Sequence, residues 1–236
     1  MRFCLRPGRP SHSSSPFLEI DEPSSVHPLI TGAVEGDLDE AVLRRIMAHV
    51  GLALGAVHGR KGKPALLRSI AGYNHAAKYS PWVVLVDLDR DCDCAPTCAG
   101  RWLAEPAPQM LLRIAVRAIE SWLLADHERV AELLGLSVKA IPSDPDQIEN
   151  PKQRLVDLAR RSRRRVIREE LVPRVASGRA VGPFYTARMI EFVEDTRAGW
   201  RPAAAVHRSD SLARCVRRLR SLRDQSCRPR KEGDEP

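Results

Sequence analysis

The stretch Val83-Val84-Leu85-Val86-Asp87-Leu88-Asp89-Arg90-Asp91 decides the fold of this chain. A short, uninterrupted aliphatic run predicts a strand that is buried on both faces, as in a parallel α/β sheet. Side chains two positions apart on a strand point the same way, so Asp87 and Asp89 are expected to share a face. Open α/β sheets bind their ligands at this carboxyl end. Two carboxylates there suit Mg²⁺ or Mn²⁺, and an aspartate-rich turn after a strand is the alternative interpretation.

A second acidic segment follows another short apolar stretch, at residues 29–35. Glu35 stands where this strand is expected to end, and Gly36 permits a tight turn. Apolar residues at near-helical spacing then predict a helix over 39–50. Asp37 or Asp39 is expected to cap that helix. Glu35 is expected at the same sheet edge as Asp87.

The order of the predicted elements indicates the fold class. Strands and helices are expected to alternate along the chain, which predicts a mostly parallel sheet. The expected elements are two strands flanking the 39–50 helix, a helix from Pro64 to Ala77, the acidic strand at 82–88, a candidate strand at 110–119 and a helix from Ser121 to Leu134. Beyond residue 150 the pattern is helical, at 151–175, 183–196 and 209–223. The expected organisation is a disordered leader (1–27), an α/β core (28–150), a helical extension packed on the core (151–225) and a disordered tail (226–236).

These acidic motifs, in this order, resemble the Toprim domain. The motifs are Val34-Glu35-Gly36 with Asp39, followed by Asp87-x-Asp89 after an apolar strand. The later segment Ala118-Ile119-Glu120-Ser121-Trp122-Leu123-Leu124-Ala125-Asp126 resembles the bacterial domain-of-unknown-function 4276 family, which is related to the Toprim domains of OLD-family nucleases. The likeness extends over most of residues 29–223 and includes Pro151-Lys152 and Trp200-Arg201-Pro202.

The resemblance implies a Toprim-like (Rossmann-like) α/β fold and a Mg²⁺- or Mn²⁺-dependent site. In that site Glu35 is the expected general acid/base, and Asp87 and Asp89 are the expected metal ligands, with Asp91 and Glu120 as further ligands. The alternative role for Glu120 is that of an acid at a helix N-terminus. Asp126 is expected to be a solvated position within the helix that starts at Ser121.

The charge of the chain favours an anionic partner. The formal net charge is +8 at pH 7, which favours nucleic acid, either DNA or RNA. Two basic segments are candidates for phosphate binding, with solvent-facing basic turns as the alternative: Arg60, Lys61 and Lys63 in one, and Arg161, Arg164 and Arg165 in the other. The few aromatic residues argue against an extended base-stacking platform, and four are expected to be core anchors: Trp122, Phe184, Phe192 and Trp200.

The six cysteines are expected to be reduced, because the chain shows no secretory signal. The spacing of Cys92, Cys94 and Cys98 lacks an obvious partner for a zinc site, so these thiols are expected to have no role of their own. No apolar run approaches the roughly 20 residues that span a bilayer. A soluble, cytoplasmic protein without a membrane partner is the expectation.

Three functions remain open from the sequence. The first is a metal-dependent nuclease or phosphotransfer enzyme acting on nucleic acid, in a defence or repair context that the resemblance alone suggests. Any ATPase would then be a separate partner chain. The second is a catalytically silent module that binds nucleic acid or a protein partner. The third is a metal-dependent enzyme acting on a small phosphorylated substrate. The oligomeric state is not determined by the sequence.

Overall fold

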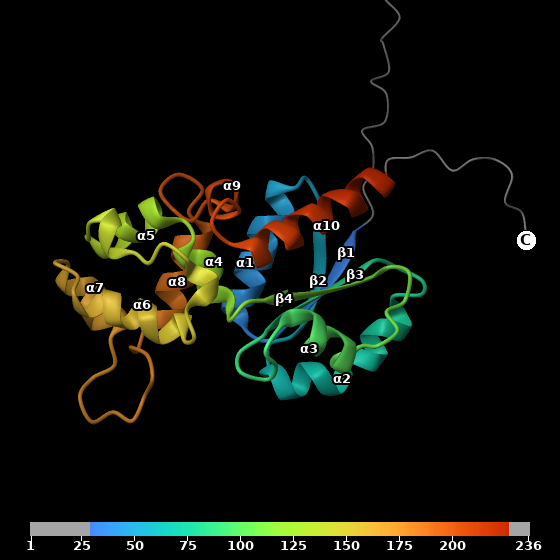
Figure 1. Cartoon of the computed structure of the whole chain (residues 1–236), viewed down its shortest axis with the longest axis horizontal. Coiled ribbons are helices and arrows are strands. Elements are labelled where there is room, and N and C mark those ends of the chain that lie inside the picture. Colours follow the sequence, from blue (N-terminus) through green and yellow to red (C-terminus); the bar gives the residue numbers. More distant parts are fainter. Residues whose placement is uncertain (1–28, 227–236) are drawn as a thin grey trace, which may run out of the picture.

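The structure, a computed structural model, describes residues 29–226 (Figure 1). The expected leader and all but the first residue of the expected tail lie outside the described residues. Four parallel strands form one sheet in the order β2-β1-β3-β4. The strands are β1 (Ile30–Val34), β2 (Leu54–Gly59), β3 (Trp82–Asp87) and β4 (Met110–Ala115).

Helices cover both faces of the sheet, and the strand pattern explains why. All six residues of β3 are buried, because its side chains alternate between two hydrophobic cores. Val83 and Leu85 belong to the core shared with α1 (Asp37–His49) and α10 (Asp210–Ser226). Val84 and Val86 belong to the core shared with α2 (Lys63–Ala76), and α3 (Ala95–Trp102) packs on the same side. Figure 1 shows α2 and α3 on one side of the sheet and α10 on the other.

The remaining helices form a group beyond the carboxyl end of β4, with α4 next to the sheet (Figure 1). They are α4 (Ile119–Leu124), α5 (His127–Leu134), α6 (Pro151–Arg160), α7 (Arg165–Leu171), α8 (Tyr185–Glu194) and α9 (Pro202–Ala205), with 3-10 turns at Val138–Ala140 and Pro145–Gln147. Their buried residues are continuous with the core under α1. The prediction of an α/β fold, with a parallel sheet flanked by helices and a helical C-terminal extension, is confirmed.

The helix predicted from Ser121 to Leu134 is in fact two helices, and Asp126 lies at the break between them. Asp126 is the N-cap of α5 and accepts a hydrogen bond from the Arg129 N–H. Its side chain is fully buried and is held by the Arg201 guanidinium at 2.6 and 2.9 Å. The prediction of a solvated position was therefore wrong, because Arg201, which is 75 positions away in the sequence, pairs with this carboxylate in the folded chain.

Other predictions about the helical part also need correction. The helix predicted over 151–175 is divided into α6 and α7, because the Ser162 hydroxyl accepts the Arg164 N–H and stabilises a turn between them. The short helices α3 and α9 were not predicted. Trp122, Trp200 and Phe192 are buried as expected, but Phe184 is 59% exposed.

The expectation of reduced cysteines was wrong for one pair. Cys92 and Cys98 form a disulfide, with Cα atoms 5.7 Å apart, because the chain turns into α3 immediately after Cys94. Cys94 is free and exposed, and Cys215 is free and buried. Within residues 29–226, no helix has both the length and the apolar character needed to cross a membrane.

Candidate active site at the carboxyl ends of the strands

Four carboxylates from separate segments gather where β1 and β3 end. Glu35 directly follows β1, Asp39 lies in the first turn of α1, Asp87 is the last residue of β3, and Glu120 lies in the first turn of α4. Asp39, Asp87 and Glu120 are buried, and Glu35 is half-buried. The structure thus places Glu35 at the same sheet edge as Asp87, as expected.

Backbone hydrogen bonds fix the relative positions of these acids. The Asp87 N–H donates to Glu35 Oε1 at 2.7 Å. The Ile119 N–H donates to Asp87 Oδ1 at 2.9 Å. The ends of β1 and β3 and the start of α4 are therefore joined through the carboxylates themselves.

Glu120 is held by two side chains from the helical extension. The Tyr185 hydroxyl at the start of α8 donates to Glu120 Oε1 at 3.1 Å. Lys152 Nζ in the first turn of α6 lies 3.4 Å from the same oxygen. Glu120 has no solvent exposure, whereas the Lys152 side chain is half exposed. Lys152 therefore lies between the buried acids and the solvent.

Burial and mutual repulsion favour the protonated forms of three of these acids: Glu35, Asp39 and Asp87. Burial, together with the charges of Glu35 and Glu120, raises the pKa of Asp39 to about 7. Burial and the charges of Asp39 and Glu120 hold the pKa of Asp87 well above its usual range. Burial also raises the pKa of Glu35, although the Asp87 N–H and Lys63 oppose that shift. A group of acids with raised pKa values in one place is typical of a functional site.

The negative charge of the same acids stabilises the protonated form of Lys152. The charge of Glu120 is the largest cause that raises the pKa of Lys152, and Asp87 and Asp39 contribute to the rise. Lys152 therefore stays cationic beside the acids. Burial, followed by the charge of Glu120, places the pKa of Tyr185 well above its ordinary value, so the phenol remains a hydrogen-bond donor.

Asp89 and Asp91 stand at the exposed side of this cluster. Both carboxylates form ion pairs with Lys63, and the Lys63–Asp91 distance is 2.9 Å. Lys63 is placed there by the turn that follows β2, because the Arg60 N–H donates to the Val34 carbonyl. Gly59 is required in that turn: it has φ +91°, and a Cβ would lie 2.2 Å from the Val34 oxygen.

The other predicted phosphate-binding residues lie in two separate places. Arg60 forms an ion pair with Glu40 at 2.8 Å, and Lys61 is exposed beside it. Arg161, Arg164 and Arg165 are exposed at the junction of α6 and α7. Lys152 begins α6 and Arg161 follows its end, so a rise of 1.5 Å per residue separates them by roughly 13 Å. The structure therefore does not bring these arginines into the carboxylate cluster.

The donor atoms of the cluster are of the type that hard divalent cations prefer. Within residues 29–226, Asp39 Oδ1 and Glu120 Oε2 are buried without a hydrogen-bond partner. Buried oxygens of this kind normally have a partner, and a cation would both satisfy them and relieve the repulsion among the acids. As the side chains stand, no group of three or more His, Cys, Asp or Glu residues in this part of the chain is arranged to hold a metal ion.

Sequence reasoning missed part of this cluster. Asp39 was expected to cap α1 if Asp37 did not, but the N-cap is Gly36, and no side chain caps the helix. The sequence feature that could have placed Asp39 in the cluster is its position four residues after Glu35, at the start of a helix that follows a strand. Lys152 follows Asn150-Pro151, which is a helix start. Nothing in the sequence connected Tyr185 to Glu120.

Comparisons of the chain with protein-family models, with curated proteins and with solved structures found no match.

Proposed function

We propose that this chain is a Toprim-like, Mg²⁺- or Mn²⁺-dependent nuclease or phosphotransfer enzyme that acts on nucleic acid. One observation carries the proposal: acids from four segments meet at the carboxyl end of the sheet, and two of their buried oxygens have no partner within residues 29–226. The order of the acidic motifs, which resembles the Toprim domain, supports the same conclusion.

Three of the acids are suited to hold the cation. Asp39, Asp87 and Glu120 are buried, and carboxylate oxygens are the ligands that Mg²⁺ and Mn²⁺ prefer. Such a cation, when bound, neutralises charge that develops on a phosphate and orients the attacking or leaving oxygen. Asp89 and Asp91 would join this set only after leaving Lys63, so their role as ligands stays a prediction.

The chain's own groups supply the remaining chemistry. Glu35 is half-buried beside Asp87 and has a pKa raised by burial, which is the direction that suits a carboxylate that accepts and returns a proton. Lys152 presents a cation at the exposed edge of the acids, where it would attract a phosphate. Lys63 would offer a second cation to a phosphate once Asp89 and Asp91, with which it is paired, turn to the metal.

The positive charge of the chain supports nucleic acid as the substrate. A net charge of +8 favours a polyanion. Exposed arginines at the junction of α6 and α7 lie roughly 13 Å along α6 from Lys152. A polymer can reach both places at once, whereas a small phosphorylated substrate cannot.

A catalytically silent binding module is the second candidate. The ion pairs of Lys63 with Asp89 and Asp91 favour it, because a lysine neutralises carboxylates without a metal. The arrangement of the described acids, which does not enclose a metal ion as it stands, favours it as well. Such a module would bind nucleic acid equally well after loss of Asp87.

A cleavage assay tests the first proposal against the second. Single- and double-stranded DNA and RNA would be incubated with wild type, Glu35→Gln and Asp87→Asn in Mg²⁺ or Mn²⁺. Both variants keep an oxygen that can accept the observed backbone hydrogen bond. Asp224→Asn, at an exposed position on α10, is the matched control. Metal-dependent cleavage lost only in the site variants supports the enzyme. Salt-sensitive binding by all proteins without cleavage supports the silent module.

A further inference from the structure

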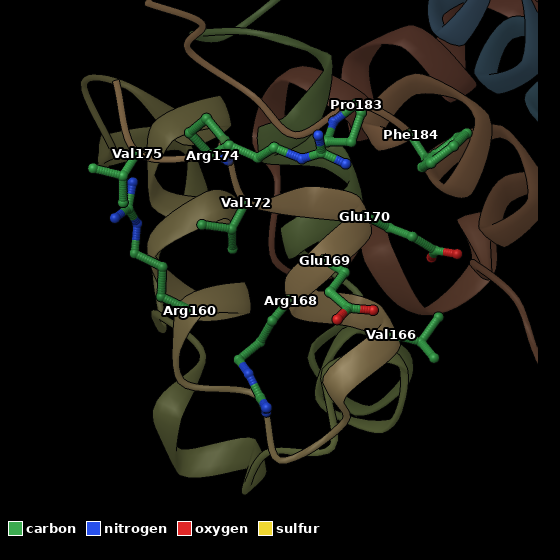
Figure 2. A pocket seen from close by; sticks show the side chains of 11 residues that line it. Arg160, Val166, Arg168, Glu169, Glu170, Val172, Arg174, Val175, Pro183 and Phe184 are labelled. Atoms are coloured by element: carbon green, nitrogen blue, oxygen red, sulfur yellow. The ribbon is translucent and has the colours of Figure 1, made fainter. Parts of the chain in front are cut away.

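A depression of about 740 Å³ lies outside the carboxylate cluster, on the helical extension (Figure 2). Its walls come from the end of α6, from α7, and from the two ends of the loop at residues 172–184 that leads to α8. In the view of Figure 2, Phe184 and Val166 lie at one end of the depression. Val175 and Arg160 lie at the other.

Exposed apolar side chains are concentrated in this depression. Within residues 29–226, six large hydrophobic residues are exposed, and three of them line it: Val166, Val175 and Phe184. Single exposed hydrophobic residues are ordinary on a protein surface. Several in one hollow indicate a surface that meets a ligand or partner.

The position of Phe184 is fixed by the backbone. The Gly182 N–H donates to the Leu171 carbonyl at 2.9 Å, and the Phe184 N–H donates to the Glu170 carbonyl at 3.1 Å. A Cβ on Gly182 would lie 2.2 Å from the Glu170 oxygen, so only glycine allows this close approach. The loop therefore closes tightly and holds the exposed ring of Phe184 in place.

The charged side chains around the ring leave positive charge uncompensated. Glu170 is paired with Arg188 at 2.6 and 2.8 Å, and Glu169 with Arg165 at 2.7 Å. Arg174 lines the depression without a carboxylate partner in the described part of the chain, whereas the Arg168 guanidinium donates to the Ser162 carbonyl at 2.5 Å. The surface therefore combines an exposed aromatic ring with one guanidinium group, that of Arg174, which no described carboxylate neutralises.

We infer that this depression binds single-stranded nucleic acid, with a base stacked on the Phe184 ring and a neighbouring phosphate on Arg174. Stacking on an aromatic ring needs an unpaired base, which a duplex does not offer. The inference deepens the proposed function and rests on it for the link to the reaction. That link is short, because Phe184 is followed directly by Tyr185, whose hydroxyl contacts Glu120. A strand bound in the depression lies beside the helix that reaches the carboxylate cluster.

Binding to a fluorescently labelled 12-nucleotide oligothymidylate, measured by anisotropy in EDTA, tests the inference without requiring cleavage. Phe184→Ala is expected to weaken binding about 10-fold, and Phe184→Tyr to retain it. Arg174→Ala is expected to reduce the slope of log affinity against log salt by about 0.7. A duplex of the same length should bind wild type and Phe184→Ala alike. Tyr79→Ala and Arg217→Ala, which change an exposed aromatic residue in the turn after α2 and an exposed arginine on α10, are the matched controls.

Three results would overturn the inference: no binding of the single strand by wild type, equal binding by Phe184→Ala, or stronger Phe184-dependent binding of an aspartate-rich peptide with the same net charge. The third would assign the depression to an acidic protein segment. Cleavage with no effect of Phe184→Ala would leave the proposed function standing and remove this subsite. Phe184-dependent binding of the single strand by a protein that never cleaves nucleic acid would keep this subsite and remove the proposed enzymatic function.

Discussion

The Tyr185 hydroxyl donates a hydrogen bond of 3.1 Å to Glu120 Oε1, and both side chains are buried. This contact joins the start of α8 to the start of α4, across 65 positions of sequence. Lys152 approaches the same oxygen from α6. The helical extension therefore supplies two of the groups that contact and orient Glu120, and the candidate site requires both halves of the chain.

Tyr185→Phe removes the hydroxyl and leaves the ring in the core. We expect the free energy of unfolding to fall by about 1–2 kcal/mol, because Glu120 loses a buried hydrogen bond and keeps only Lys152. Urea denaturation measures the change. Tyr73→Phe is the control, since no hydrogen bond of the Tyr73 hydroxyl is found within residues 29–226 and its ring stacks on Trp82 at 5.1 Å. Equal stability of the Tyr185 variant and wild type would show that the hydrogen bond contributes nothing.

Lys152→Met removes the cation nearest the buried acids. Without it, we expect the pKa of Asp39 to rise further above its usual range, because the ammonium group opposes that rise. If the chain cleaves nucleic acid, the rate should fall roughly 10-fold or more, as one electrostatic contact to the reacting phosphate is lost. Lys139→Met, at an exposed position outside the site, is the control. Unchanged cleavage in Lys152→Met would exclude a role for this lysine.

The stability of the metal-free protein should depend on pH through Asp39. Its pKa is about 7 in the folded chain, against an ordinary value of 3.8 for an aspartate side chain. Between these values the folded state binds more protons than the unfolded state. The free energy of unfolding therefore falls as pH rises from about 4 to about 7, by on the order of 3 kcal/mol.

Thermal unfolding in EDTA across this range, compared between wild type and Asp39→Asn, measures the dependence. The variant should show a shallower decline, because residue 39 no longer ionises. Mg²⁺ should stabilise wild type more at pH 8 than at pH 5, since it binds the ionised carboxylates. Parallel pH curves for the two proteins would contradict the assignment to Asp39.

Asp126→Ala should be strongly destabilising. The substitution leaves Arg201 without the carboxylate that it contacts at 2.6 and 2.9 Å, and it removes the N-cap of α5. Arg201 is 40% exposed and keeps Glu128 at 3.1 Å, so the loss of the charged hydrogen bonds and of the N-cap is expected to cost about 2–3 kcal/mol. Asp224→Ala, which breaks an ion pair with Arg223 at the surface, should cost less than about 1 kcal/mol. Similar losses for the two variants, measured by denaturation, would refute the special role of Asp126.

Local sequence patterns were sufficient for the sheet and for one side of the site. The aliphatic run Val83–Val86 predicted a strand buried on both faces, and β3 is that strand. Glu35 and Asp87 were expected at one sheet edge, and the Asp87 N–H contacts Glu35. These features follow from the two-residue period of strands and from the common direction of parallel strands, so each can be deduced within a few residues of the motif.

The residue pattern alone predicted the alternation of strands and helices, the parallel sheet, and the carboxyl edge at which acids collect. The contacts of Lys152 and Tyr185 with Glu120 became known only from the folded structure. The same is true of the ion pairs of Lys63 with Asp89 and Asp91, and of the exposure of Phe184 next to the buried Tyr185. The reason is physical. Hydrophobic periodicity reports that a helix has a buried face, but the packing of distant helices selects the partner that each polar side chain meets.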